Sequence, residues 1–220
     1  MIFNRKYEFY YSITVLLGVG NDWYLQNKSN WLFSRNLFAF LILSMLGYSA
    51  KYNKIVILRA LFGFLANYTF SMAISILKLV EITAYYYLIP IFDLFLNWIV
   101  GEKFNGKKIW TILICLFVLI WLLPTFNIFM LLACLFWSCG DLCIRYSTCT
   151  PGQDIYTFSF INCLVSLLID NPIIDYGILP IAINDLLVQY LLFIVFTNRS
   201  FWQLLPVRLL DLFLSYLLQK

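Results

Sequence analysis

Long runs of apolar residues follow one another along the whole chain, interrupted only by short polar breaks. The breaks contain charged residues or Gly, Pro and Asn, which tend to end regular structure. A helix that spans a membrane needs about 20 mostly apolar residues, and the runs approach that length. The pattern predicts nine membrane spans, at residues 9–24, 32–48, 55–77, 82–100, 109–123, 126–144, 155–169, 178–197 and 201–218.

The composition places these helices in lipid rather than in a soluble core. Of the 220 residues, 63% are hydrophobic, 20% are aromatic and only 12% are charged. Soluble domains contain about 45 to 50% apolar and about 25% charged residues, and a chain of this length cannot bury such an excess. We therefore expect an all-α polytopic membrane protein whose short turns leave no room for an extramembrane domain.

The distribution of Lys and Arg predicts the orientation of the chain, because positively charged loops stay in the cytoplasm. A cytoplasmic N-terminus places most of the cations on the inner side, namely Arg5, Lys6, Lys51, Lys54, Arg59, Lys103, Lys107, Lys108, Arg145 and Arg199. The outer side then holds Lys28, Lys78 and Lys220, with Arg35 near a span end. We expect the N-terminus to be cytoplasmic and Arg59 to act as an inner anchor.

The missing residue types exclude most enzyme chemistry. Histidine is absent, which removes the commonest general base and metal ligand. The six cysteines lie in or beside apolar segments without a C-x-x-C spacing, as small buried hydrophobes do. The chain has no G-x-x-x-x-G-K-[ST] loop for ATP. We expect no enzyme activity, no metal or other cofactor and no nucleic-acid partner.

Three short segments recur in the same order at a spacing of 118 to 122 residues. The matches are DLFLNW (93–98) with DLFLSY (211–216), GND (20–22) with CGD (139–141), and NY (67–68) with QY (189–190). This spacing contains five predicted spans, an odd number, so the second copy enters the membrane from the opposite side. The pattern predicts an inverted repeat of the kind found in secondary transporters.

Four further stretches follow one another in the first half: RALFG (59–63), LVEITA (79–84), IPIF (89–92) and GEKF (101–104). Their order and spacing resemble the first repeat of the drug/metabolite transporter superfamily, EamA type. The pairs ND (21–22) and RN (35–36) are similar in particular to the branch that contains bacterial S-adenosylmethionine uptake transporters. The first repeat would then cover residues 7–123, and a second, incomplete repeat residues 126–218.

The resemblance implies an architecture and a function. Its family has ten spans in two inverted five-helix repeats, with spans one to four and six to nine around the substrate cavity. This chain would lack the tenth span, and we expect a homodimer or another partner to cover the exposed face. The resemblance further implies the inner membrane of a bacterium, and a small polar or zwitterionic metabolite as substrate. The narrower branch implies S-adenosylmethionine.

Polar residues inside the predicted spans are the candidates for a substrate site, because a charge at a span centre costs about 2.5 to 3.5 kcal/mol and usually faces a cavity or a partner. Asp93 and Asn97 are four residues apart and share a helical face. The repeat gives Asp211 and Ser215 the same relation. All four are predicted to bind substrate; the alternative is that they bond neighbouring helices, or that Arg208 neutralises Asp211.

Five more residues complete the predicted site. Asn67 and Gln189 are related by the repeat and offer amides, and Asp22 and Asp141 are related in the same way and offer carboxylates near span ends. Arg35 is placed to meet an anionic group such as a substrate carboxylate. The alternative is that the amides bond adjacent helices and that the charged groups face interfacial water.

The leading hypothesis is a secondary transporter that moves a small polar metabolite by alternating access. Two other classes stay open. One is a nontransporting remnant or structural membrane subunit, and the other is a lipid-modifying membrane enzyme with Asp93 and Asp211 as acids or metal ligands.

Overall fold

All regular structure in the described part of the chain is helical. The computed structural model describes residues 5–26, 28, 31–103, 106–122, 126–169, 173–198 and 216–217. Its principal helices are α1 (Arg5–Leu25), α2 (Trp31–Met45), α3 (Lys54–Ile74), α4 (Leu79–Tyr85), α5 (Leu88–Ile99), α6 (Gly106–Leu122), α7 (Ile128–Tyr146), α8 (Pro151–Ile169), the short 3₁₀ helix η1 (Tyr176–Ile178) and α9 (Leu179–Asn198). Among the described residues, five helical segments are long and apolar enough to cross a membrane. An all-α chain with several helices suited to a membrane is therefore confirmed.

The apolar runs locate the helices closely. Each of the first eight predicted spans overlaps a helix or a pair of helices, and the ninth, 201–218, lies mostly outside the described residues. Polar breaks fix some of the helix starts. The side-chain oxygens of Asn53 and Asn127 accept hydrogen bonds from Ile55 N (3.3 Å) and Met130 N (3.0 Å), which caps α3 and α7.

The fourth predicted span, 82–100, is broken between α4 and α5, and Pro90 explains the break. Proline has no N–H to donate to the carbonyl of Tyr86, and its ring crowds that carbonyl. The chain passes this point through tighter turns, in which Tyr87 N donates to Ala84 O (3.1 Å) and Ile89 N donates to Tyr86 O (3.2 Å). The sequence pattern missed this interruption because the apolar run continues through it.

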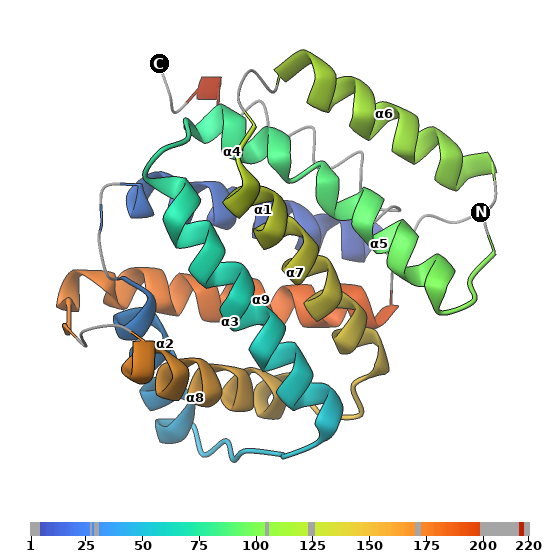
Figure 1. Cartoon of the computed structure of the whole chain (residues 1–220). Coiled ribbons are helices and arrows are strands. Elements are labelled where there is room, and N and C mark those ends of the chain that lie inside the picture. Colours follow the sequence, from blue (N-terminus) through green and yellow to red (C-terminus); the bar gives the residue numbers. More distant parts are fainter. Residues whose placement is uncertain are drawn as a thin grey trace.

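Helices that are distant in sequence pack against one another. Helix α3 lies against α7 and α8, α1 against α9, α2 against α8 and α9, and α5 against α7 (Figure 1). Helix α6 contacts α4 and α5 at the edge of the bundle. An aromatic cluster joins three of these segments, with the Trp137 ring 5.2 Å from the Phe70 ring and 5.6 Å from the Tyr86 ring. The core is therefore built between the two halves of the chain.

Two contacts identify the two ends of the bundle. At one end, called the Asp175 end, Lys28 Nζ lies 3.1 Å from Asp175 Oδ2. At the other, called the Lys51 end, the backbone N–H of Lys51 donates to Thr157 Oγ1 at 3.1 Å. Helices α2 and α9 therefore begin at the Asp175 end, whereas α3 and α8 begin at the Lys51 end.

The Lys28–Asp175 pair is about one-third exposed, with side-chain exposures of 32% and 34%. The hydrogen bond from Lys28 holds the pKa of Asp175 below its ordinary value of 3.8. The same bond raises the pKa of Lys28 above 10.5. The pair therefore contributes its full stabilisation at pH values between the two ordinary pKa values, 3.8 and 10.5. The stabilisation is lost as pH falls through the lowered pKa of Asp175 or rises through the raised pKa of Lys28. Exposure keeps the contribution small.

Gly63 allows α3 to approach α8. A Cβ added there would overlap the ring of Phe158, which is itself buried. We expect Gly63→Ala to lower the free energy of unfolding by about 1 to 3 kcal/mol, because overpacking forces the ring away from its place. Thermal unfolding in detergent measures the change.

Gly18→Ala in α1 is the matched control. A Cβ added at Gly18 meets no atom of the described residues within 4 Å, and alanine favours a helix over glycine by about 1 kcal/mol. Gly18→Ala should therefore leave the unfolding temperature unchanged or raise it. Equal unfolding temperatures for the two variants would contradict the close packing of α3 on α8.

Candidate functional site

A cavity of about 230 Å³ lies among the helices. Its lining comes from α1, α2, α3, α5, α7, α8 and α9, and from the break between α4 and α5. Aromatic rings form much of the wall. Charged groups of both signs interrupt it, namely Asp22, Arg35, Arg59, Asp141 and Asp185. A concave, largely apolar pocket with a few polar groups is the usual form of a small-molecule site.

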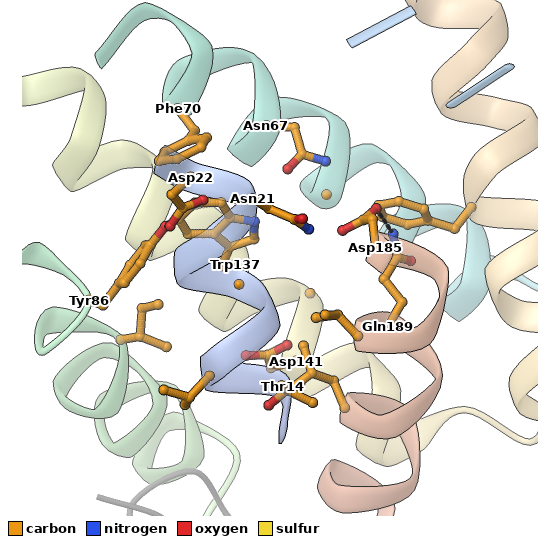
Figure 2. Close-up of a pocket in the computed structure, with 18 of the residues that line it drawn as sticks. Thr14, Asn21, Asp22, Asn67, Phe70, Tyr86, Trp137, Asp141, Asp185 and Gln189 are labelled. Atoms are coloured by element: carbon orange, nitrogen blue, oxygen red, sulfur yellow. Dashed lines mark hydrogen bonds between the residues drawn. The ribbon is translucent and has the colours of Figure 1, made fainter. Parts of the chain in front are cut away.

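One side of the cavity combines a carboxylate with aromatic rings. The hydroxyl of Tyr86 donates a hydrogen bond to Asp22 Oδ2 at 2.6 Å. Figure 2 shows Asp22 beside Tyr86, Phe70 and Trp137, which form the aromatic cluster of the core. The break before Pro90 places Tyr86 here. A carboxylate beside aromatic rings suits a cationic group, which is attracted by the negative charge and by the ring faces.

The opposite side of the cavity is formed by α9. Gln189 Nε2 donates to Asp185 Oδ2 at 2.8 Å, and Asn184 Nδ2 donates to Asn21 Oδ1 at 2.8 Å, which ties α9 to α1. Asp185 and Gln189 lie across the view from Asp22 and Tyr86 (Figure 2). Gln189 Oε1 is buried and accepts no hydrogen bond from the described residues.

Two arginines are buried at the cavity, each only 6% exposed. Arg35 lies 4.8 Å over the ring of Trp31, and its Nε is 3.7 Å from Asp185 Oδ2. Arg59 forms an ion pair with Asp154. The expected anchor role of Arg59 is not what the structure shows, because its guanidinium is enclosed rather than extended toward water.

The cavity brings together five of the nine site residues predicted from the sequence: Asp22, Arg35, Asn67, Asp141 and Gln189. Asp93 and Asn97 are not in its lining. Asp211 and Ser215 lie outside the described residues.

Asp93 and Asn97 bind Arg145 instead. Arg145 Nη2 donates to both carboxylate oxygens of Asp93, at 2.8 and 2.9 Å, and Nη1 donates to Asn97 Oδ1 at 2.7 Å. Asp93 is fully buried. The shared face of Asp93 and Asn97 therefore joins α5 to α7, which is the helix-bonding alternative given by the sequence.

Two charged residues of the cavity were missed as candidates. Asp185 lies four residues before Gln189 on the same helical face, and this spacing, identical to that of Asp93 and Asn97, was a usable signal. Arg59 gave no such signal, since its partner Asp154 is 95 residues away.

The described residues contain no group of three or more His, Cys, Asp or Glu side chains placed to hold a metal ion. Comparison of the chain with protein-family models, with curated proteins and with solved structures finds no match.

The Asp93–Arg145 pair makes a testable contribution to stability. We expect Asp93→Leu to lower the free energy of unfolding by about 3 to 5 kcal/mol, because it leaves the Arg145 charge without a partner in an apolar setting. Replacing both residues, as Asp93→Leu with Arg145→Met, should restore most of the loss. Unfolding temperatures in detergent compare the variants. A double variant as unstable as the single one would show that the pairing is not the cause.

Proposed function

We propose that this protein is a secondary transporter that moves a small polar or zwitterionic metabolite across a membrane by alternating access. The observation that carries the proposal is the cavity, because it holds charges of both signs inside a bundle of apolar helices. Charged groups at such depth are costly unless they are paired or face a cavity, and they commonly mark a substrate pathway. A purely structural bundle has no need of this cost.

The two sides of the cavity favour a zwitterionic substrate. Asp22 with the rings of Tyr86 and Trp137 offers a place for an ammonium or sulfonium group. Arg35 and Gln189 offer hydrogen-bonding groups on other helices of the same cavity. A neutral lipid tail would satisfy none of these groups, whereas a molecule with separated charges would satisfy both sides.

The order of helix contacts supports an internal inverted repeat. Exchanging α1 with α7, α2 with α8 and α3 with α9 converts the α3–α7 contact into the α9–α1 contact. The same exchange converts the α3–α8 contact into the α9–α2 contact, and the α2–α8 contact into itself. Each of these contacts is present, as a two-fold relation between the repeats requires, whereas the α7–α9 contact has no comparable α1–α3 counterpart among the described residues.

The sequence resemblance narrows the proposal to the drug/metabolite transporter superfamily, EamA type, with S-adenosylmethionine as the first substrate to test. Its sulfonium and ammonium groups fit the Asp22 side of the cavity in charge, and its carboxylate fits Arg35. We further propose a bacterial inner membrane as the location, with the N-terminus and the Lys51 end in the cytoplasm. Lys51, Lys54 and Arg145 lie toward that end.

Counterflow into proteoliposomes tests transport. Vesicles loaded with unlabelled S-adenosylmethionine should accumulate the radiolabelled compound, and amino acids and other amines serve as competitors. A hydrogen bond to a charged group is worth about 1.5 to 3 kcal/mol. We therefore expect Asp22→Asn and Asp141→Asn to raise KM about ten- to a hundredfold.

Asp175→Asn is the matched control, because Asp175 is an acid that lies outside the cavity lining. The KM of this variant should stay close to that of the unmodified protein. Absence of counterflow for every compound, in protein that unfolds cooperatively, would contradict the transporter. Counterflow of another metabolite but not of S-adenosylmethionine would retain the transporter and reject the narrower substrate.

A further inference from the structure

Two ion pairs at the cavity join helices of the first half of the chain to helices of the second half. Arg35 of α2 faces Asp185 of α9, and Arg59 of α3 is bound to Asp154 of α8. Both arginines line the cavity. Three of the four side chains are at least nine-tenths buried, and Asp185 is the most exposed, at 18% of its side chain.

The two pairs lie toward opposite ends of the bundle. Arg35 and Asp185 are in the second turns of α2 and α9, which begin at the Asp175 end. Arg59 is in the second turn of α3 and Asp154 in the first turn of α8, and both helices begin at the Lys51 end. Arg35 and Asp185 line the cavity toward the Asp175 end, and Arg59 lines it toward the Lys51 end, so the cavity wall contains a residue of one pair near each end.

The pairs also correspond under the proposed repeat, with their charges reversed. Arg35 and Asp154 are 119 residues apart, the spacing that separates Asp22 from Asp141. The counterpart of α3 is α9, where Asp185 lies on the face of Gln189, as Arg59 lies on the face of Asn67. Arg59 precedes Asn67 by eight residues, whereas Asp185 precedes Gln189 by four. Arg59 and Asp185 therefore face the cavity from corresponding helices, but their positions along those helices differ by about one turn.

The two pairs differ in how tightly they are closed. Arg59 Nη1 donates a hydrogen bond to Asp154 Oδ2, and its guanidinium lies 5.0 Å over the ring of Phe158. Arg35 Nε is 3.7 Å from Asp185 Oδ2, beyond hydrogen-bond length. Arg35 Nε and Nη2 find no hydrogen-bond acceptor among the described residues, while Asp185 accepts from Gln189. Arg59–Asp154 is therefore hydrogen-bonded, although Asp154 Oδ1 has no partner among the described residues, whereas Arg35–Asp185 is an ion pair without a hydrogen bond.

We infer that these pairs are the two gates of the transport cycle: Arg59–Asp154 closes the Lys51 end in this structure, and Arg35–Asp185 closes the Asp175 end in the alternate state. The inference rests on the proposed function. Nε and Nη2 form the side of the guanidinium that donates two parallel hydrogen bonds to a carboxylate. In the alternate state, Asp185 could accept both of these bonds from Arg35. Closing one gate compensates for the pair broken at the other.

Sidedness of chemical labelling tests the gates without any substrate. The six native cysteines are replaced by serine or alanine, and Gly18→Cys places one thiol in the cavity, where an added Cβ meets no atom of the described residues within 4 Å. Tyr176 at the Asp175 end and Tyr52 at the Lys51 end are both exposed. Separate Tyr176→Cys and Tyr52→Cys variants therefore report which end of the bundle faces each side of sealed vesicles. A membrane-impermeant maleimide is then added to one side.

We expect Gly18→Cys to react mainly from the Asp175 end. Asp154→Asn should weaken the shut gate and increase reaction from the Lys51 end at least about fivefold, a typical size for coupling between two states. Exchanging the charges, as Arg59→Asp with Asp154→Arg, should return the labelling toward that of the parent protein. Asp185→Asn should further favour access from the Asp175 end, because the other gate then cannot close.

Asp93→Asn is the control, since it weakens a buried ion pair that does not line the cavity, and it should leave the sidedness unchanged. Labelling that does not respond to Asp154→Asn, or that responds equally to Asp93→Asn, would overturn the gates. The result is independent of transport. A sidedness switch without counterflow would reject the proposed transport and keep the gates, whereas counterflow without a switch would reject the gates alone.

Discussion

Buried charge is the constraint on which this structure depends. A chain that is 63% hydrophobic offers few groups to neutralise a charge, and an uncompensated one costs several kcal/mol in an apolar environment. Among the described residues, three buried ion pairs join the first half of the chain to the second, namely Arg35–Asp185, Arg59–Asp154 and Asp93–Arg145. The partly exposed Lys28–Asp175 pair makes the same kind of link. Breaking one of the buried pairs leaves a buried charge without a partner, so these pairs favour the helix neighbours that the structure shows, together with close packing such as that of Gly63 on Phe158.

The same residue types serve two purposes according to their surroundings. In the Asp93–Arg145 pair both carboxylate oxygens accept hydrogen bonds and Asn97 Oδ1 accepts a further one, and the pair lies outside the cavity lining. Buried polar atoms without a hydrogen-bond partner among the described residues occur in both places: Arg145 Nε and Asn97 Nδ2 at this pair, and Arg35 Nε and Nη2 with Gln189 Oε1 at the cavity. The carboxylate hydrogen bonds of Asp93 fix the packing of α5 on α7, whereas the unpartnered groups of Arg35 and Gln189 border a cavity and are open to a ligand or to a second conformation.

The sequence predicted most helices and part of the site, for different physical reasons. Helix positions follow from local apolar runs, so they were readable. The interruption at Pro90 was missed because the apolar run continues through it, although proline itself tends to break a helix. Of the residues that the repeat matches singled out, the cavity lining contains Asp22, Asn67, Asp141 and Gln189 but neither Asp93 nor Asn97. Asp93 was expected beside them, but its partner Arg145 is 52 residues away, and tertiary pairing of that kind has no local signature. The repeat itself stays a prediction.

The distribution of charge between the two halves of the chain couples the proposed gates to each other. Both arginines belong to the first half of the chain, and both aspartates belong to the second. Neither half can neutralise its own gate charges at these positions, so each gate forms only across the interface between halves. Opening both gates together would leave two buried arginines without close partners, each at a cost that a single open gate avoids. A rocking motion that closes one gate as it opens the other keeps one pair formed throughout, and alternating access requires this exclusion.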